Sequence, residues 1–273
     1  MSIKKTIEAT VKDIQSKIDF SPEIGIVLGS GLGNFSKEIE IEKEIPYSKI
    51  LNFPTSTVKG HSGKLIFGKV NGKKVVAMSG RFHFYEGYSI EQVVFPIRVM
   101  KFLGIHTIVI SNASGGMNPD FKVGDIMIIN DHINMQPVHP LTGKNDETLG
   151  PRFPDMLNAY DKDIRAKAKE IAAKNNIKVH EGVYVGVQGP TFETPAEYKA
   201  FYLMGGEAIG MSTVPEVIVA RHMGVKVFGI SVISDLGYPP EAMENINHDM
   251  VIKAAKGAEP SISIIIKELI KEL

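Results

Sequence analysis

Several groups of polar and glycine residues in this sequence directly follow apolar, strand-like segments. The first is Gly29-Ser30-Gly31-Leu32-Gly33, which follows the apolar segment Ile24 to Leu28. Glycine permits close approach of the backbone to a ligand, and Ser30 adds a hydroxyl, so a phosphate is a suitable guest. The segment lacks the Lys-Ser/Thr ending of a P-loop and the last glycine of the dinucleotide fingerprint. A plain connection between a strand and a turn is therefore the alternative.

A second group, Ser79 to Tyr88, places an arginine and a histidine beside a glycine in a strand-ending turn. The planar fork of Arg81, together with the imidazole of His83, can contact several oxygens of one phosphate. The alternative is a surface loop that carries a solvated arginine and a partly buried histidine.

The third group, Ser111 to Pro119, consists mainly of Ser, Asn and Gly after the apolar segment Thr107 to Ser111. These residue types predict a turn at the end of a strand. Parallel sheets bind ligands at the carboxyl ends of their strands, so the three groups predict one shared crevice. A set of turns that binds no ligand is the alternative.

A different chemistry is indicated by Gln188 to Thr194, where an aromatic ring stands beside a carboxylate. Phe192 can stack on a planar base, and Glu193 can accept hydrogen bonds from the N–H groups of that base. Alternatively, Thr194 is a helix N-cap that forms a capping box with Glu197, and Phe192 is a core residue.

The elements that must position these groups alternate along the chain, which predicts an α/β fold with a central mixed sheet flanked by helices. The pattern predicts strands over Ile24 to Leu28, Lys64 to Val70, Lys74 to Met78, Thr107 to Ser111, Asp125 to Asn130, Val183 to Gln188 and Lys226 to Ile233. It predicts helices over Ser89 to Leu103, Asp161 to Asn175, Thr194 to Leu203, Val214 to His222 and from Asn247 onward. Gln136 to Pro154, rich in Pro, Gly, Asn and Asp, is predicted as a long loop.

Composition narrows the class of protein. The 273 residues carry 31 basic and 31 acidic side chains, and this balance disfavours a nucleic-acid partner. The absence of cysteine removes thiolate chemistry and fits a reducing compartment. Met1 to Lys17 is charged and lacks the apolar core of a signal peptide, and no segment has the apolar length of a membrane span. A cytoplasmic enzyme without membrane association is therefore expected.

Taken together, these segments resemble the trimeric, low-molecular-mass purine nucleoside phosphorylase family, which is related to the methylthioadenosine phosphorylases. The likeness extends from about Ile24 to His248 in family order, through GSGLG, GHSGKLIFG, SGRFHFYEGY, SNASGGMNPDFKVGDIMIINDHIN, GPTFETPAEY and GMSTVPEVIVARH. It implies one nucleoside phosphorylase domain over residues 1–273, a homotrimer, and a pentosyltransferase of purine salvage. The implied reaction is reversible phosphorolysis of purine ribo- and deoxyribonucleosides, with inorganic phosphate as co-substrate and no cofactor.

The resemblance also implies roles for individual residues. For phosphate it implies Ser30, His61, Arg81, His83, Ala113 and Ser212. For the nucleoside it implies Tyr85, Phe153, Phe192, Glu193, Ile209, Met211, Ser234, Asp235 and His248, with Phe153 lent to the sugar pocket by a neighbouring subunit. The residues expected to take part in catalysis are His83, Asn112, Glu193, Asp235 and His248.

One departure concerns the base. Family members selective for 6-oxopurines have Asn where this chain has Asp235, whereas the methylthioadenosine branch has Asp. An ionised carboxylate only accepts hydrogen bonds and so suits a 6-amino group, while Glu193 suits the N1–H of a 6-oxopurine. A raised pKa that keeps Asp235 protonated would reconcile the two features. Inosine and guanosine are the expected substrates, with adenosine as an open alternative.

Two other functions stay open at this stage. A methylthioadenosine or methylthioinosine phosphorylase is suggested by Asp235. Glu193 and His248 argue against it, the latter because a histidine suits a 5′-hydroxyl better than a methylthio group. A non-catalytic protein that binds purine nucleosides would have no evident use for a phosphate site. No metal site is expected, because His132, His139 and His248 lack a recognisable ligand spacing.

Overall fold

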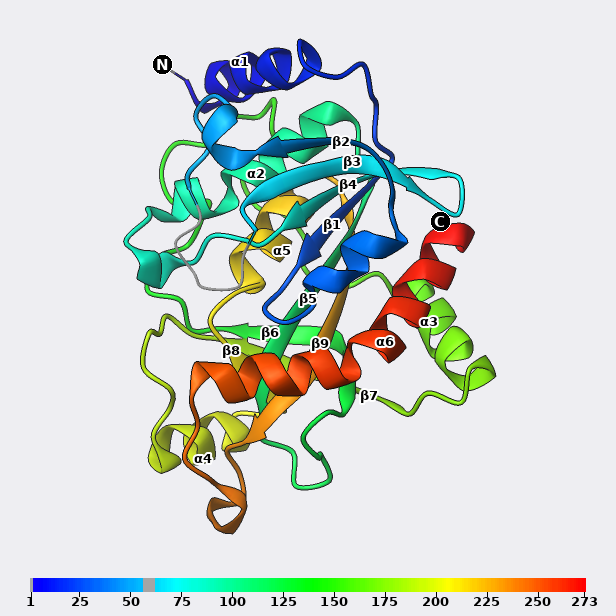
Figure 1. Ribbon diagram of the computed structural model, residues 1–273. Coiled ribbons are helices and arrows are strands. Elements are labelled where there is room, and N and C mark those ends of the chain that lie inside the picture. Colours follow the sequence, from blue (N-terminus) through cyan, green and yellow to red (C-terminus); the bar gives the residue numbers. More distant parts are fainter. Residues whose placement is uncertain (1, 56–61) are drawn as a thin grey trace.

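Strands and helices alternate along most of the chain, as Figure 1 shows for the computed structural model, which describes residues 2–55 and 62–273. The strands in this part of the chain are β1 (Ile24–Leu28), β2 (Glu40–Pro46), β3 (Lys64–Val70), β4 (Lys73–Ser79), β5 (Thr107–Gly116), β6 (Ile126–Asn134), β7 (Val179–Gly186), β8 (Ala208–Gly210) and β9 (Lys226–Leu236). The α-helices are α1 (Ile3–Gln15), α2 (Ile90–Leu103), α3 (Lys162–Lys174), α4 (Pro195–Leu203), α5 (Val214–His222) and α6 (His248–Glu272). The predicted α/β class is confirmed.

All of these strands belong to one mixed sheet with the order β2-β3-β4-β1-β5-β8-β7-β6-β9. β1 lies between β4 and β5 and is parallel to both, so the turns that follow these three strands emerge at the same edge. β5 pairs with β8 and also, in parallel, with β9. The strands from β5 to β9 in this order therefore close into a ring beside the open part of the sheet.

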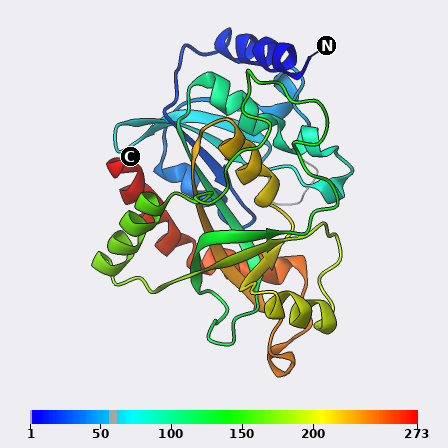
Figure 2. The same cartoon turned by 180° about the vertical axis from the view of Figure 1, so that it is seen from behind.

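Helices cover both faces of the sheet. α3 and α6 lie together on one face, where Ile24, Ile26 and Leu28 of β1 point into their apolar surfaces. The opposite face, seen from behind in Figure 2, is covered by α2 and α5, with α1 packed on α2. β1 is buried along its whole length, which explains why it is a continuous apolar run rather than an alternating one.

Capping residues explain where the helices begin. Ser89 caps α2 and forms a capping box with Gln92. The N-cap of α4 is Thr194, whose side chain accepts from the backbone of Glu197 while that carboxylate accepts from the backbone of Thr194. The capping-box interpretation of these two residues is confirmed, and the helix start directs the preceding loop toward the sheet edge.

The predicted turn over Ser111 to Pro119 is wrong in its first half. β5 continues as an extended strand to Gly116, paired with β9 from Thr107↔Lys226 to Gly116↔Leu236. Asn, Ser and Gly favour turns locally, but here a neighbouring strand supplies the hydrogen bonds that a turn would have made internally. β6 and β9 also extend beyond their predicted ends, to Asn134 and Leu236.

Three elements were not among those predicted. α1 is amphipathic and buries Ile7, Val11 and Ile14 against the core. The edge strand β2 is mostly exposed, so it lacks the apolar pattern of an inner strand. The third, β8, has only three residues and is held between β5 and β7.

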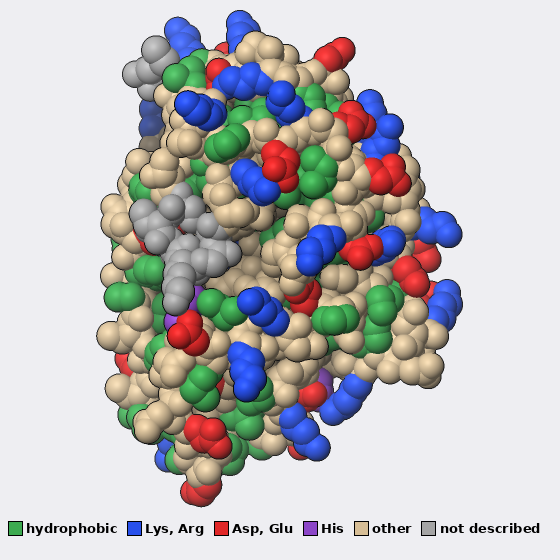
Figure 3. Space-filling model, in the orientation of Figure 1, with side chains coloured by type: hydrophobic (Ala, Val, Ile, Leu, Met, Phe, Trp, Pro, Cys, Tyr) green, Lys and Arg blue, Asp and Glu red, His purple; other side chains and the backbone are tan. Residues whose placement is uncertain are grey.

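The segment from residue 136 to 154 contains no helix or strand, as expected. Arg152 holds it together, because its Nη1 donates to the carbonyls of Leu141 and Gly143 at 3.0 Å each. None of the described helices is long and apolar enough to span a membrane. On the face in Figure 3, acidic and basic side chains are interspersed rather than gathered by sign.

Candidate active site

A cavity of about 360 Å³ lies where the ends of β1, β4 and β5 meet the loop before α4, the start of α5 and the end of β9. This is the shared crevice expected from the strand ends. The predicted site residues on its wall are Ser30, Arg81, His83, Tyr85, Asn112, Ala113, Phe192, Glu193, Ile209, Met211, Ser212, Ser234, Asp235 and His248. Its volume is in the range of pockets for small molecules.

Two predicted site residues are not on this wall. His61 lies outside the described residues. Phe153 belongs to the long loop and is 87% exposed, with Arg152 over its ring at 5.7 Å from the centroid. Within one chain, Phe153 therefore does not contribute to the cavity.

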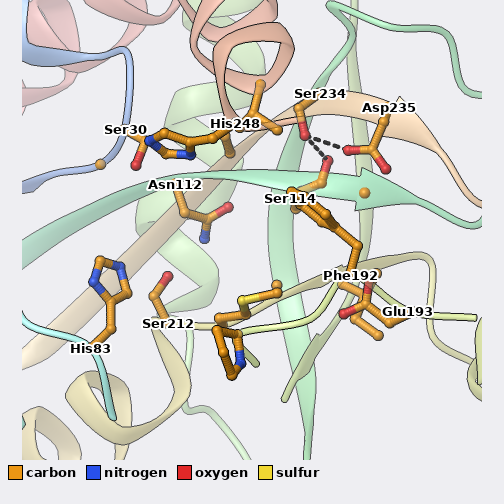
Figure 4. A pocket seen from close by; sticks show the side chains of 18 of the residues that line it. Ser30, His83, Asn112, Ser114, Phe192, Glu193, Ser212, Ser234, Asp235 and His248 are labelled. Atoms are coloured by element: carbon orange, nitrogen blue, oxygen red, sulfur yellow. Dashed lines mark hydrogen bonds between the residues drawn. The ribbon is translucent and has the colours of Figure 1, made fainter. Parts of the chain in front are cut away.

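Two ends of the cavity differ in chemistry, as Figure 4 shows. We call the first the cationic end, with side chains Ser30, Arg81, His83 and Ser212. The second, the carboxylate end, has side chains Glu193, Tyr198, Ser234 and Asp235. Asn112 and His248 project between the two ends.

At the cationic end, Arg81 is held from several sides and is only 1% exposed. Its Nη1 donates to Ser212 Oγ at 2.8 Å, and its Nη2 donates to the carbonyl of Ser111 at 2.6 Å. Behind it, the buried Glu216 of α5 places Oε1 3.5 Å from Nε. A buried cation of this kind needs such partners, and they fix the guanidinium in one orientation.

Thr213 joins this network and was not predicted as a site residue. Its Oγ1 accepts from Arg81 Nη1 at 3.3 Å and from Asn112 Nδ2 at 2.8 Å. Its φ of 72° lies in the left-handed region, which is unusual for a β-branched residue. This backbone turn ends the segment after β8 and starts α5, so Ser212 faces the cavity at a helix N-terminus.

His83 is positioned by the short 3-10 turn that follows it. Glu86 Oε1 lies 2.8 Å from the backbone nitrogen of His83 and 3.0 Å from its Nδ1, and the ring of Tyr85 stacks on the imidazole at 4.8 Å. Burial lowers the pKa of His83, and the hydrogen bond to Glu86 opposes that shift. With Nδ1–H donating to Glu86, the neutral imidazole has no hydrogen on Nε2.

The turn that carries Ser30 is anchored by α6. Glu259, 5% exposed, accepts from the backbone of Asn34 at 2.6 Å and from the side-chain amide of Asn34 at 2.8 Å. Gly29 is required by a close approach, because a Cβ there would lie 2.6 Å from the carbonyl oxygen of Ser111. The first and third predicted strand ends thus touch each other.

At the carboxylate end, hydroxyl groups hold Asp235. Ser234 Oγ lies 2.6 Å from Asp235 Oδ1 and 3.1 Å from the carbonyl of Ser114, and both contacts are drawn in Figure 4. The hydroxyl of Tyr198 lies 3.1 Å from Asp235 Oδ2 and also interacts with the carboxyl of Glu193. Tyr198, on α4, was not predicted as a site residue.

The pKa values of both carboxyl groups are raised. Burial raises the pKa of Asp235, while its hydrogen bonds from Ser234 and Tyr198 oppose the rise. Burial also raises the pKa of Glu193, and the charges of Asp235 and Glu197 add to it. The two partly buried carboxyls act on each other and on the same tyrosine hydroxyl, so their titrations are coupled.

Between the ends, two polar atoms are buried and have no hydrogen-bond partner among the described residues. These are Nε2 of His248 and Oδ1 of Asn112. Buried polar atoms in native proteins normally have partners, so these two indicate where a polar ligand completes the site.

Of the residues that sequence reasoning missed, Thr213 stands directly after Ser212 and Tyr198 lies five positions after Glu193. The proximity in sequence was the only signal for either one. In the described part of the chain, no group of three or more His, Asp or Glu side chains is arranged to hold a metal ion.

Residues 23–271 match the family model described as the phosphorylase superfamily. The chain is 48% identical over 270 residues to purine nucleoside phosphorylase 1 of Geobacillus stearothermophilus, with 99% of this chain and 98% of that protein covered. Two crystal structures of the purine nucleoside phosphorylase of Schistosoma, one from Schistosoma mansoni with adenosine and one with hypoxanthine, superimpose with a TM-score of 0.93. Both are 42% identical and cover 98% of this chain and 97% of theirs.

These similarities extend over nearly the whole of both chains, and the matched part contains every described residue of the cavity wall. The chain therefore belongs to the phosphorylase superfamily and, within it, to the purine nucleoside phosphorylases.

Proposed function

We propose that the cationic end of the cavity binds inorganic phosphate and the carboxylate end binds the base of a purine nucleoside, so that the N-glycosidic bond lies between them. The products are a free purine and ribose 1-phosphate, or deoxyribose 1-phosphate. One observation carries this assignment: the buried cation Arg81, which donates to Ser212, lines the same cavity as Glu193 and Asp235, and Figure 4 shows Ser212 at the end away from these carboxyls. As a purine nucleoside phosphorylase, the chain is a pentosyltransferase.

Phosphate binding is assigned to Ser30, Arg81, His83, Ser212 and the backbone of Ala113, with His61 expected nearby. Arg81 and the N-terminus of α5 supply positive potential, and the hydroxyls supply oriented hydrogen bonds. His83, whose pKa is lowered by burial, is neutral near pH 7; because its ring hydrogen is on Nδ1 and directed to Glu86, its Nε2 accepts a hydrogen bond from a protonated phosphate oxygen. This arrangement aims one phosphate oxygen at the anomeric carbon.

The sugar is assigned to the wall between the ends. The buried Nε2 of His248 suits the 5′-hydroxyl of ribose, and the free Oδ1 of Asn112 suits a polar group near the reacting bond. Tyr85 and Met211 complete the contacts with the ribose. A hydroxyl partner for His248 favours ordinary nucleosides over 5′-methylthio nucleosides.

Base binding is assigned to Phe192, Glu193, Ile209, Ser234 and Asp235. Phe192 and Ile209 provide apolar surfaces for the ring, and the raised pKa values of the carboxyls allow one of them to donate a hydrogen bond. Inosine and guanosine are the preferred substrates in this proposal, and adenosine is also accepted. The Schistosoma enzyme in complex with adenosine and with hypoxanthine supports this breadth.

Cleavage separates charge, because the sugar becomes cationic as the purine leaves as an anion. Phosphate held below the anomeric carbon stabilises the sugar cation and then forms the new C–O bond. A protonated carboxyl at Asp235 or Glu193 stabilises the departing base by donating a hydrogen bond. The residues of this chain suffice for these steps, with phosphate as co-substrate and no further cofactor.

A homotrimer accounts for Phe153. Its ring is almost fully exposed and lies away from the cavity of its own chain, which fits a side chain that completes the sugar site of a neighbouring subunit. The whole chain then acts as one phosphorylase domain per subunit. The lack of cysteine and of a membrane-spanning helix in the described residues supports a cytoplasmic location in purine salvage.

The test is release of free base from inosine, guanosine, adenosine and methylthioadenosine in parallel, with and without phosphate. We expect phosphate-dependent release from inosine and guanosine, and a slower release from adenosine. Preference for methylthioadenosine would support a methylthioadenosine phosphorylase instead. Binding without phosphate-dependent cleavage of any substrate would overturn the assignment and leave a nucleoside-binding protein.

A further inference from the structure

Tyr198 has a position that the proposed base contacts do not explain. It is 3% exposed, its hydroxyl lies 3.1 Å from Asp235 Oδ2, and the carboxyl of Glu193 acts on the same hydroxyl. Two glycines make room for it. A Cβ at Gly237 would lie 2.0 Å from the tyrosine ring, and a Cβ at Gly115 would lie 2.8 Å from its hydroxyl. The fold therefore seats this ring specifically beside the two carboxyls.

A count of hydrogens shows what the hydroxyl can do. A tyrosine hydroxyl has one hydrogen, and an ionised carboxylate can only accept. If both carboxyls were ionised, the oxygen of Tyr198 would face one of them without a hydrogen between. With one carboxyl protonated, the pair carries a single negative charge, and Tyr198 donates to whichever carboxylate is ionised.

Ser234, on the other side of Asp235, also has more acceptors within reach than hydrogens to donate. Its Oγ is within hydrogen-bond distance of both Asp235 Oδ1 and the carbonyl of Ser114, but it has only one hydrogen to give. It donates to Asp235 when that group is ionised. When Asp235 is protonated on Oδ2, its Oδ1 no longer carries a charge, and Ser234 can donate to the carbonyl of Ser114 instead. Both protonation states of Asp235 thus have complete hydrogen bonds.

We propose that Tyr198 is a hydroxyl switch that lets one proton reside on either Glu193 or Asp235 and so matches the site to 6-oxopurines or to 6-aminopurines. For a 6-oxopurine, Glu193 is ionised and accepts the N1–H, while neutral Asp235 faces O6 and N7. For a 6-aminopurine, Glu193 is protonated and donates to N1, while ionised Asp235 accepts from the amino group. This inference rests on the proposed function.

The exchange conserves protons. Tyr198 gives its hydrogen to one carboxylate as it takes the hydrogen of the other carboxyl, so the tyrosine stays neutral and no proton enters or leaves the site. The titratable groups that act on the pair are each other, Tyr198 and Glu197 of α4. Glu197 is exposed and bonded to the start of its helix, so it is not part of the exchange.

The first experiment compares Tyr198→Phe with wild type on inosine and adenosine across pH. Without the hydroxyl, Asp235 keeps the donor Ser234, so the charge settles on Asp235 and the proton on Glu193. We expect kcat/KM for inosine to fall by about tenfold or more, while the value for adenosine changes much less. Tyr202→Phe is the matched control, since Tyr202 lies one turn further along α4 and stacks on Tyr238 instead.

An equal fall on both substrates would indicate a structural role for Tyr198 and would overturn the switch, as would no change on either. A change in the phosphate KM would have the same meaning, because the switch acts only on the base. Phosphate-dependent cleavage of inosine by the wild type is measured alongside. If the wild type does not cleave inosine in a phosphate-dependent manner, the proposed function is wrong. If it does, but Tyr198→Phe leaves the ratio of kcat/KM for inosine and adenosine unchanged, only the switch is wrong.

A second measurement needs no variant. Calorimetric titration of wild type with hypoxanthine and with adenine, in buffers of different ionisation enthalpy, counts the protons exchanged on binding. We expect the number of protons exchanged with solvent to be close to zero for both bases near pH 7, because the proton only moves between Glu193 and Asp235. Uptake of about one proton with adenine alone would show that both carboxyls are ionised in the free enzyme, and would overturn the proposal.

Discussion

The two ends of the cavity differ in how their hydrogen bonds are fixed. At the cationic end, Arg81 lies on the turn after the inner strand β4. It donates to Ser212 and to the carbonyl of Ser111 and lies beside the buried Glu216. At the carboxylate end, the hydroxyls of Ser234 and Tyr198 each have more acceptors than hydrogens. In the proposed function, the rigid end binds phosphate, whose shape is constant, and the end with two hydrogen-bonding states binds bases that differ at one edge.

The largest expected effect is at the rigid end. Arg81→Met should lower kcat/KM for phosphate by about a thousandfold, because a buried donor and its charge are lost together. The variant should also unfold at lower temperature, since Glu216 would lose its buried cation. Steady-state kinetics at varied phosphate and thermal unfolding measure the two effects.

Adding Glu216→Gln to the same chain separates these effects. The double variant should recover thermal stability, because the unpaired buried charge is gone, but should not recover activity. An unchanged phosphate KM in the single variant would contradict the assignment of Arg81 to phosphate.

The next largest effect is expected at Glu193. Glu193→Ala should lower kcat/KM for inosine by about a hundredfold while the phosphate KM stays the same, since only the base contact is removed. Glu197→Gln is the control, because glutamine preserves the capping box at the start of α4. Full turnover of inosine by Glu193→Ala would show that Glu193 does not bind the base.

Asp235→Asn sharpens the contrast between the ends by locking one state of the base site. An amide cannot ionise, so adenosine should lose about tenfold in kcat/KM while inosine is retained. The ratio of the two kcat/KM values is the measurement. A ratio that rises toward adenosine would mean that Asp235 does not accept from the 6-amino group.

A smaller effect is expected from outside the cavity. Phe153→Ala should raise the KM for inosine by less than about tenfold without loss of stability, because the side chain is exposed in its own subunit. Co-expression with the Arg81→Met chain then tests the trimer. Activity above the sum of the two variants is expected, since an intact Phe153 can serve a neighbouring intact Arg81.

The smallest expected effect is on how the free energy of unfolding depends on pH. Burial raises the pKa of Asp235 and Glu193 above their usual 3.8 and 4.5, so the folded protein keeps protons that the unfolded chain has lost. This contribution is complete below those usual values and disappears as pH rises through the raised pKa values. In urea unfolding, the free energy of unfolding of Asp235→Asn should therefore fall less steeply than that of wild type as the pH rises from about 4. Asp120→Asn, at an exposed carboxylate after β5, should decline like wild type.

The residues at the two ends differ in how well the sequence predicted them. The turns after β1 and β4, with Ser30, Arg81 and His83, follow apolar runs and were recognised from local composition. The extension of β5 to Gly116 was not, because its turn-forming residues are held extended by pairing with β9, more than a hundred positions later. Tyr198 was missed for a similar reason, since it looks like an ordinary helix residue until the fold places it on Asp235, 37 positions away.

Local sequence patterns predicted the α/β class, the strand ends that line the cavity, and residue types that suit phosphate and a purine. These depend on patterns within a few neighbouring residues, where propensity and periodicity act. The contact of Arg81 with Ser212, 131 positions apart, and the grouping of Asp235, Tyr198 and Glu193 around one tyrosine hydrogen depend on the three-dimensional fold. Burial, protonation and hydrogen-bond partners depend on what surrounds a group in space, and local sequence does not contain that information.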